Sequence, residues 1–345
     1  MDKDPFKEYI KESEPDKRDK GYAWYTAIGL QAVDGLKTSD YLMHTAVRNI
    51  WGEISFEEAN VLLQSYYKEN PSRDAGDRTE EADKVSARIA EILSEQAFSF
   101  TPNEYLSIHR RLFTGIYPHA GRVRDYNITK KEWVLDGATV FYGSATELRA
   151  TLEYDFSEER KFSYRRLSMD EIIRHLALFV SMLWQIHAFG EGNTRTTAVF
   201  FIMYLRTLGF DVKNDIFAES AWYFRNSLVR ANYNDFTKGI HETTEYLELF
   251  LRNLLLGEHN PLHNWTLHIR GAFKETKKTD IESGKSDIQD GKSDIEVLKA
   301  DIDNRFTAKT TEHILKLREE FQGQTLFGRS DVMRVLDTKA SRTSE

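Results

Sequence analysis

Apolar positions at helical spacing dominate the chain, and the clearest case follows Ser168. Apolar residues recur there at intervals of one, three and four: Ile172, Ile173, Leu176, Phe179, Val180, Leu183 and Trp184. This spacing places them on one face of a helix. Ser168 and Glu171 have the pattern of a capping box at its start. The pattern therefore predicts a helix that begins after Ser168 and runs into His187.

Similar patterns predict further helices over about residues 195–208, 216–231 and 243–256, with Gly209 ending the first of them. Strand-like alternation is clear only near residues 126–143, where apolar and β-branched residues flank Asp136-Gly137. An Asp-Gly pair in this setting is a strong signal for a hairpin turn. We therefore expect an all-α fold that carries one small β-hairpin.

The chain changes character after about residue 265. Isoleucines then recur every seven residues among glycines and charged residues: Ile281, Ile288, Ile295 and Ile302. One apolar residue per heptad is fewer than the two that stabilise a coiled coil. A solvated, partly helical linker is the first interpretation, and a weakly pairing helix that forms a homodimer is the alternative.

Residues 307–345 have the order of elements that begins a winged-helix or helix-turn-helix module, with its second helix at Arg329–Leu336. The sequence ends about where a recognition helix would begin, so we expect an interaction segment rather than DNA binding. Four regions follow: an N-terminal helical region (1–70), a central domain (71–265), a linker (266–306) and a partial winged-helix-like segment (307–345).

Composition narrows the class of protein. The 345 residues carry a net charge of −8 and no cysteine, which excludes disulfides and thiolate chemistry and argues against general nucleic-acid binding. The N-terminal stretch is densely charged and lacks the apolar core of a signal peptide. The apolar runs are too short to span a membrane. We expect a cytoplasmic protein without membrane contact.

The candidate chemistry lies between two predicted helices, in the sequence HAFGEGNTR from His187 to Arg195. Gly190, Gly192 and Asn193, followed by Thr194 at the start of a helix, allow backbone N–H groups to converge on an anion. Arg195 adds a planar set of donors.

Glu191 beside such an anion site favours a bridging Mg²⁺, because a carboxylate and a phosphate otherwise repel one another. A neutral imidazole at His187 is suited to accept a proton from a hydroxyl. Phe189 is most simply a core anchor. Together these residue types predict phosphoryl or nucleotidyl transfer.

The stretch resembles the signature of the Fic family, H-x-F-x-[D/E]-G-N-G-R-x-x-R, and the resemblance covers about residues 75–255. Most Fic enzymes transfer AMP from ATP to a protein hydroxyl. The resemblance implies His187 as general base and Glu191 as the Mg²⁺ ligand. It further implies Gly192 and Asn193 in the phosphate cradle, and Arg195 as the arm that holds the terminal phosphates of ATP.

Two positions depart from this signature. Thr194 replaces a glycine, and Ala198 replaces the second arginine, which in the family helps to place the γ-phosphate. The resemblance also makes the hairpin a flap that docks a target protein by strand addition. Ile128, Thr129, Trp133, Val134 and Leu135 are the candidate docking residues, and the chain itself is a further candidate target.

Many Fic proteins are inhibited by a helix carrying [S/T]-x-x-x-E-[G/N]. Asp34-Gly35 lies where the glutamate and glycine would stand, although Leu30 replaces the Ser or Thr. With Ala198 in place of the second arginine, Asp34 would have to reach Arg195 or act through water. A purely structural helix is the alternative.

Three functions therefore stay open. The first is a protein adenylyltransferase. The second is a Fic enzyme that transfers UMP, phosphate or phosphocholine. The third is a non-catalytic regulator that binds a nucleotide or DNA.

Overall fold

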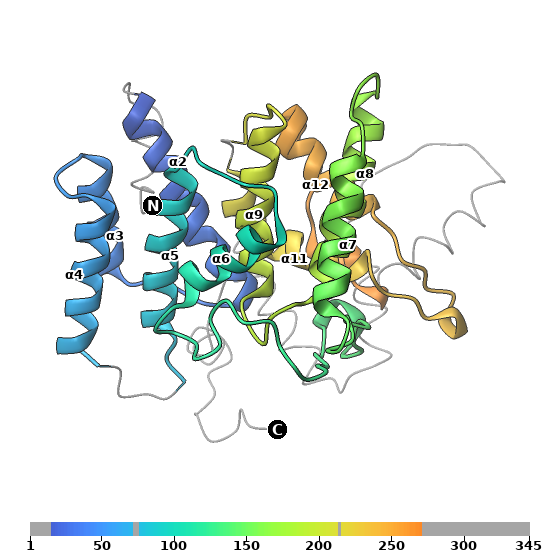
Figure 1. The fold of residues 1–345 in the computed structure, drawn as a ribbon, viewed down its shortest axis with the longest axis horizontal. Coiled ribbons are helices and arrows are strands. Elements are labelled where there is room, and N and C mark those ends of the chain that lie inside the picture. The colour runs from blue at the N-terminus through green and yellow to red at the C-terminus, as the bar shows by residue number, and fades with distance from the viewer. Residues whose placement is uncertain (1–14, 72–75, 213–214, 271–345) are drawn as a thin grey trace, which may run out of the picture. The chain divides into compact units, whose positions relative to one another are not determined.

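The computed structural model of the chain describes residues 15–71, 76–212 and 215–270, all within one compact unit, Met1–Asp280 (Figure 1). Every regular element in these residues is helical, so the predicted all-α class is confirmed. They are α2 (Pro15–Gly29), η1 (Leu30–Asp34), α3 (Asp40–Ile50), α4 (Phe56–Glu69), α5 (Thr79–Ser94), α6 (Pro102–Phe113), η2 (Trp133–Leu135), α7 (Leu148–Lys161), α8 (Met169–Ile186), α9 (Asn193–Thr207), α10 (Ile216–Glu219), α11 (Ala221–Arg230), η3 (Phe236–Lys238), α12 (Glu245–Leu256) and α13 (Asn264–Leu267).

Helix α8 forms as the sequence predicts. The Ser168 hydroxyl accepts a hydrogen bond from the Glu171 amide, and the Glu171 carboxylate accepts one from the Ser168 amide, so the capping box is complete. The helix ends at Ile186, and His187 follows in the left-handed region with φ 49°. A non-glycine residue is uncommon there. It turns the chain sharply into the loop that leads to α9.

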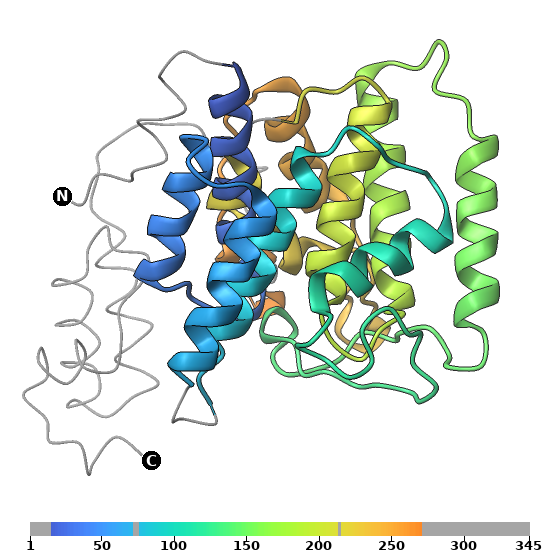
Figure 2. The ribbon, with the colours of Figure 1, turned by 60° about the vertical axis from the view of Figure 1, so that its left-hand side comes forward.

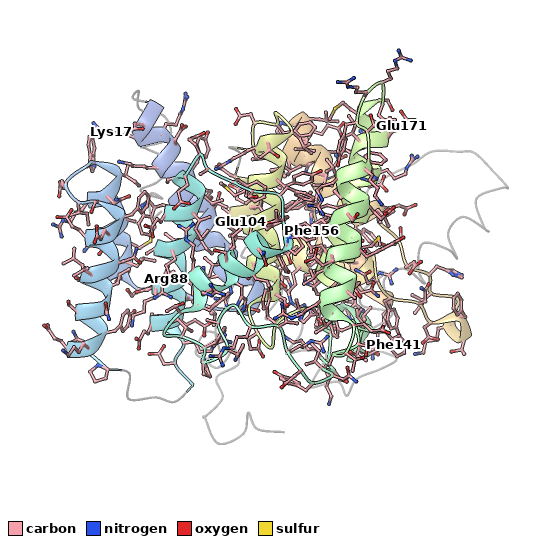
Figure 3. All side chains as sticks on the ribbon, viewed as in Figure 1. Lys17, Arg88, Glu104, Phe141, Phe156 and Glu171 are labelled. Atoms are coloured by element: carbon pink, nitrogen blue, oxygen red, sulfur yellow. The ribbon has the colours of Figure 1, made fainter. Side chains whose placement is uncertain are left out.

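Helix α9 is the central element. It contacts α5, α6, α8 and η1, and it is buried all round from Asn193 to Leu205 (Figures 1 and 2). A helix without a polar face belongs in the middle of a core. Phe156 of α7 (Figure 3) meets Phe200 of α9 in an aromatic cluster. The loop before α9 is therefore attached to a helix that is buried on all sides.

The segment expected to be a β-hairpin has no strand, so that part of the prediction was wrong. Asp136 and Gly137 do turn the chain, with φ 55° and φ 84°, as a type I′ turn requires. The preceding residues form η2 instead of a strand arm, because neighbouring Val134 and Leu135 are both buried. In a strand they would face opposite sides. We call residues 126–143 the flap segment.

The remaining predicted helices are largely present. The helix expected over residues 216–231 is divided at Ser220 into α10 and α11, whereas α12 matches its prediction and ends at Gly257 with φ 66°. None of the described helices combines the length and apolar character needed to cross a membrane.

The N-terminal helices belong to the same core as the rest of the unit. Trp24 of α2 is fully buried and donates a hydrogen bond from Nε1 to Asn49 Oδ1 (3.0 Å), and α2 packs along α5. Apolar side chains from Ala23 to Ile269 form one hydrophobic cluster. The predicted linker, from residue 271 onward, and the winged-helix-like segment lie outside the described residues.

Candidate active site

His187 stands at the end of α8 with one ring nitrogen free. Its Nδ1 lies 3.3 Å from the carbonyl oxygen of Trp184. A carbonyl only accepts, so Nδ1 carries the hydrogen and Nε2 keeps its lone pair. Nε2 is buried without a hydrogen-bond partner. An unpaired buried acceptor costs stability and therefore needs an explanation, which a catalytic role would supply.

The surroundings of His187 keep the imidazole neutral. The side chain is 3% exposed, and burial together with the positive charge of Lys130 lowers its pKa well below 6.5. The ring of Tyr142 covers it at 4.3 Å between centroids, and the Trp184 ring meets it edge-on at 5.2 Å. Neutral imidazole is the form that can accept a proton.

Arg124 fixes the backbone of this corner, a role that the sequence analysis missed. Its Nε donates to the His187 carbonyl (2.7 Å), and its amide donates to the Ala188 carbonyl (2.9 Å). Its other nitrogens donate to the carbonyls of Tyr126 and Gly143 in the flap segment. One buried guanidinium thus ties both ends of the flap segment to the loop after α8.

The loop between α8 and α9 is closed by Asn193. Its Oδ1 accepts from the Phe189 amide (3.0 Å), and its Nδ2 donates to the Phe189 carbonyl (2.7 Å). Phe189 is fully buried, as expected of an anchor. The side chain of Asn193 therefore shapes the cradle from within, while its backbone begins α9.

One glycine in this loop is required by a close contact. A side chain at Gly192 would overlap the buried Phe113 ring, whereas one at Gly190 would meet only the hydroxyl at the end of the exposed Tyr126 side chain, which can move aside. Gly192 also has φ 75° and caps α9 without a side-chain hydrogen bond. The first amide groups of α9 thus have no side-chain cap, and their partial positive charge suits an anion.

Thr194 lies beneath the loop rather than in it. Its hydroxyl accepts a hydrogen bond from Trp184 Nε1 (3.0 Å). The threonine that departs from the Fic signature therefore links α9 to α8 just before the loop. Ala198, the second departure, is fully buried among apolar residues of α9.

Glu191 is the exposed member of the loop. Its side chain is 53% exposed, and its carboxylate lies 3.4 Å from Lys130 Nζ of the flap segment. His109 Nε2 lies 3.0 Å from the Glu191 carbonyl oxygen, while His109 Nδ1 accepts from the Gly121 amide (2.8 Å). These two contacts assign the hydrogen to Nε2 of His109, another residue the sequence analysis missed.

Glu191, the one acidic residue of the loop, fits Mg²⁺ held partly by substrate. No group of three or more histidine or acidic side chains within the described ranges is placed to hold a metal ion. Mg²⁺ is commonly bound by one or two carboxylates plus substrate phosphates. A single solvent-facing carboxylate beside an uncapped helix start can supply one ligand to such a Mg²⁺ ion. It cannot form a site in which protein side chains supply every ligand.

Arg195 faces the other side of α9. It is fully buried, and Nη1 donates to Gln31 Oε1 (3.0 Å) while Nη2 donates to Glu81 Oε1 (2.7 Å) and lies 2.8 Å from Asp34 Oδ2. Phe113 lies under the guanidinium at 4.9 Å. The anticipated contact between Asp34 and Arg195 is thus present, whereas the arginine does not reach toward the loop in this conformation.

The five candidate docking residues divide by exposure. Thr129 and Trp133 are exposed, with Trp133 packing edge-on against His268 at 4.9 Å, and Ile128 is half-buried. Val134 and Leu135 lie in the core and offer no side chain to a target. The exposed part of the flap segment is therefore smaller than expected.

Residues 99–205 match the model of the Fic/DOC family. The chain carries a Fic domain. No curated protein and no solved structure matches the chain. The matched residues run from just before α6 to near the end of α9, and they include the flap segment and the whole loop from His187 to Arg195.

The match to this family indicates transfer of a nucleotide or another phosphate-containing group to a target. The matched segment contains His187 and Glu191. It also contains His109 and Arg124, whose hydrogen bonds shape the loop that carries them. By contrast, Gln31, Asp34 and Glu81 lie before residue 99. Both carboxylates that pair with Arg195 therefore come from helices outside the matched segment, whereas the Phe113 ring and the Tyr117 hydroxyl, 3.4 Å from Nη2, lie within it.

Proposed function

We propose that the protein is an adenylyltransferase that transfers AMP from ATP to a hydroxyl side chain of a target protein. The observation that carries the proposal is the neutral imidazole of His187, whose Nε2 is buried without a partner, one loop away from Glu191 and the uncapped start of α9. A base, a candidate Mg²⁺ ligand and an anion cradle are the parts that nucleotidyl transfer needs.

In the proposed reaction, a Ser, Thr or Tyr oxygen of the target gives its proton to His187 Nε2 and attacks the α-phosphorus of ATP. The bond from that phosphorus to the bridging oxygen breaks, and pyrophosphate leaves. Amide groups at the start of α9 stabilise the charge on the phosphates. Mg²⁺ on Glu191 would neutralise the leaving group. Because His187 is covered by Tyr142, the flap segment must shift to admit the hydroxyl.

For Arg195 to take part in the reaction, it has to exchange its present partners for the phosphates. Its ion pairs with Asp34 and Glu81 compete with any phosphate for the same nitrogens. We propose that η1 holds the arginine in a less active state, and that release of Arg195 toward the loop completes the phosphate site. A structural helix that merely closes the core is the alternative.

Transfer of another phosphate-containing group is the second candidate, and Ala198 favours it. This buried alanine supplies no arginine where the family signature has one, so the triphosphate of ATP loses one expected contact. UMP, phosphate and phosphocholine are the groups to compare with AMP.

The test is incubation of the full chain with Mg²⁺ and nucleotides labelled in the α- or γ-phosphate, with His187→Ala beside the wild type. Label carried by the protein from α-labelled ATP, and lost by at least about 10²-fold in the variant, supports adenylyl transfer. Label only from UTP or from the γ-position supports the second candidate. Equal labelling of both proteins would refute the proposed role of His187.

A further inference from the structure

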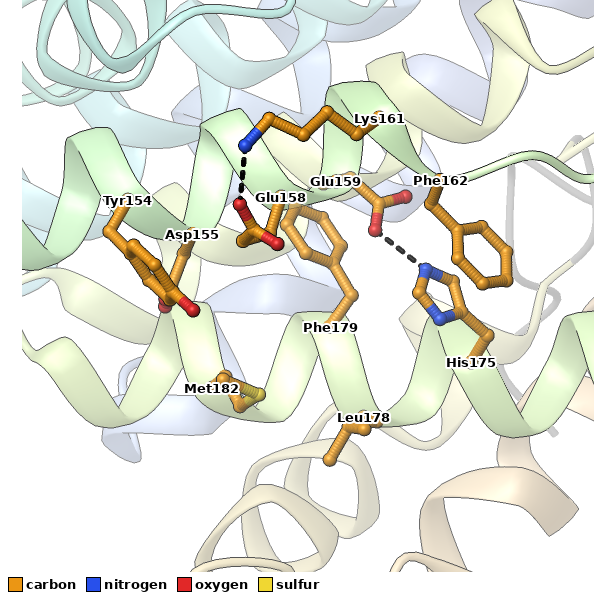
Figure 4. A pocket seen from close by; sticks show the side chains of 10 residues that line it. All are labelled: Tyr154, Asp155, Glu158, Glu159, Lys161, Phe162, His175, Leu178, Phe179 and Met182. Carbon is orange, nitrogen blue, oxygen red and sulfur yellow. Dashed lines mark hydrogen bonds and ion pairs between the residues drawn. The ribbon is translucent and has the colours of Figure 1, made fainter.

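A separate cavity of about 420 Å³ lies between α7 and α8 (Figure 4), and no residue from His187 to Arg195 lines it. Its walls are mostly apolar and aromatic. They include Tyr154, Phe162, Leu178, Phe179 and Met182. Tyr154, Leu178 and Met182 are also exposed, so the cavity opens to the surface. Its size is within the range that accommodates small organic ligands.

One carboxylate in this cavity has no partner. Asp155 is 8% exposed and lines the cavity, yet none of the described residues donates a hydrogen bond or an ammonium to it. Burial without compensation raises its pKa to about 6. A buried acid in this state is costly unless something pairs with it.

The neighbouring charges cannot serve Asp155, because they are already engaged. Glu159 accepts from His175 Nε2 (2.7 Å) and from the hydroxyls of Tyr164 and Tyr204. Lys161 pairs with Glu158 (2.7 Å) (Figure 4). Around the cavity, the carboxylates of Asp155, Glu158 and Glu159 therefore face one ammonium group, that of Lys161. Asp155 is left able to accept hydrogen bonds from a ligand.

We infer that the cavity binds an organic ammonium ion with an apolar body, its charged nitrogen on Asp155. The apolar walls suit a hydrocarbon chain or ring, and Tyr154 offers an aromatic face to the cation. A metal ion fits less well, because no group of three or more metal-ligating side chains comes together in the residues that the structure describes. This site is independent of the proposed transfer reaction.

The test uses hexylammonium and 2-phenylethylammonium as probes, with 1-hexanol and hexanoate as neutral and anionic counterparts. Binding to the full chain is measured by calorimetry and saturation-transfer NMR in an amine-free buffer at pH 7.5. Hexylammonium should bind at least about tenfold more tightly than 1-hexanol. Asp155→Asn should remove that preference. Glu153→Gln, which neutralises an exposed acid of the same helix, should retain it.

A second variant keeps Asp155, so that loss of binding in it cannot come from a fold disturbed at position 155. Met182→Lys places an ammonium group at the rim of the cavity, and it should abolish binding of the added amine. Equal binding of alcohol and ammonium, an unchanged preference in Asp155→Asn, full binding by Met182→Lys, or no binding of any probe at millimolar concentration would overturn the inference.

The pH profile provides an independent readout. Affinity for hexylammonium should fall below about pH 6, where Asp155 becomes protonated in the free protein. Tyr154, Glu158, Glu159, Lys161 and His175 also face the cavity. Asp155→Asn retains all of these groups, so any fall that survives in this variant belongs to them and counts against Asp155.

Discussion

Removal of the Asp34 carboxylate should raise the rate of group transfer, because it weakens the hold on Arg195. The guanidinium is buried and shares its contacts among Gln31, Glu81 and Asp34, so Asp34→Ala removes one of two carboxylates and leaves the other. Asp34 is partly exposed, and solvent screens its pairing. We therefore estimate a contribution of about 1–2 kcal/mol, between an exposed pair and a buried charged hydrogen bond.

That free energy corresponds to about a 5- to 30-fold shift between the held and released forms of Arg195. The assay is the initial rate of label transfer from α-labelled ATP, with wild type, Asp34→Ala and Asp34→Asn compared at equal concentration. Asp40→Ala is the matched control, because it removes an exposed acid a few residues away. Both Asp34 variants should be faster than the wild type, and the control should not.

An equal or slower rate in Asp34→Ala, with the fold intact by circular dichroism, would refute this reasoning. It would mean that the pair with Asp34 only stabilises the core. Arg195→Ala separates the two parts of the argument. If the arginine assists transfer after release, this variant should be slow whether or not Asp34 is present.

Three further outcomes follow from the same loop. Glu191→Gln should raise the Mg²⁺ concentration for half-maximal transfer by at least about tenfold. Loss of a residue that only supports a metal ligand already lowers metal affinity by about that factor. An unchanged Mg²⁺ dependence would exclude the carboxylate as a ligand. Asn193→Ala leaves the Phe189 amide and carbonyl unpaired and should lower the free energy of unfolding by about 2–4 kcal/mol in urea denaturation. Asn103→Ala, which changes an exposed asparagine of α6, is the control and should change it by less than about 0.5 kcal/mol. Burial lowers the pKa of His109 to about 4, so the unfolded chain binds this proton first. The free energy of unfolding should therefore be highest above about pH 6.5 and fall by up to about 1.4 kcal/mol per pH unit toward pH 4. A His109→Gln variant whose stability fell just as steeply would exclude this histidine as the cause.

Local signals predicted the elements that flank the loop. The capping box and the spacing of apolar residues are properties of neighbouring positions, and they predicted α8 and its end at His187 correctly. The start of α9 was predicted within two residues of its position, since the glycines before it are a local signal as well. The helix expected over residues 216–231 is interrupted at Ser220, which no strong breaker marks in the sequence.

Tertiary contacts decided the rest, and single-sequence patterns do not carry them. The flap segment was expected to pair as two strands because Asp136-Gly137 is a turn signal. Glu132 is instead buried, where it pairs with Arg225 (2.7 Å) and accepts a hydrogen bond from the Tyr142 hydroxyl (2.9 Å). These contacts from distant parts of the chain accompany a short 3₁₀ turn in place of a strand.

The direction of Arg195 likewise depends on helices far away in the sequence. Its position in the motif is visible from the spacing of residues, but its partners come from η1 and α5, so a local pattern cannot report which side of α9 it faces. His109 and Arg124 were missed for the same reason, because their importance lies in the carbonyl groups they meet. The candidate base and the candidate metal ligand were the parts of the site that a pattern could specify.

The origin of Arg195's counter-charges bears on any attempt to shorten the protein. A fragment limited to residues 99–205 would keep the guanidinium and discard both carboxylates that neutralise it. The guanidinium would keep only the Phe113 ring and the Tyr117 hydroxyl of its present neighbours, and the surface that η1 and α5 now cover would face water. We therefore expect that the segment matched by the family model does not fold well on its own, and that a shortened version has to retain α2, η1 and α5, which hold the partners of Arg195.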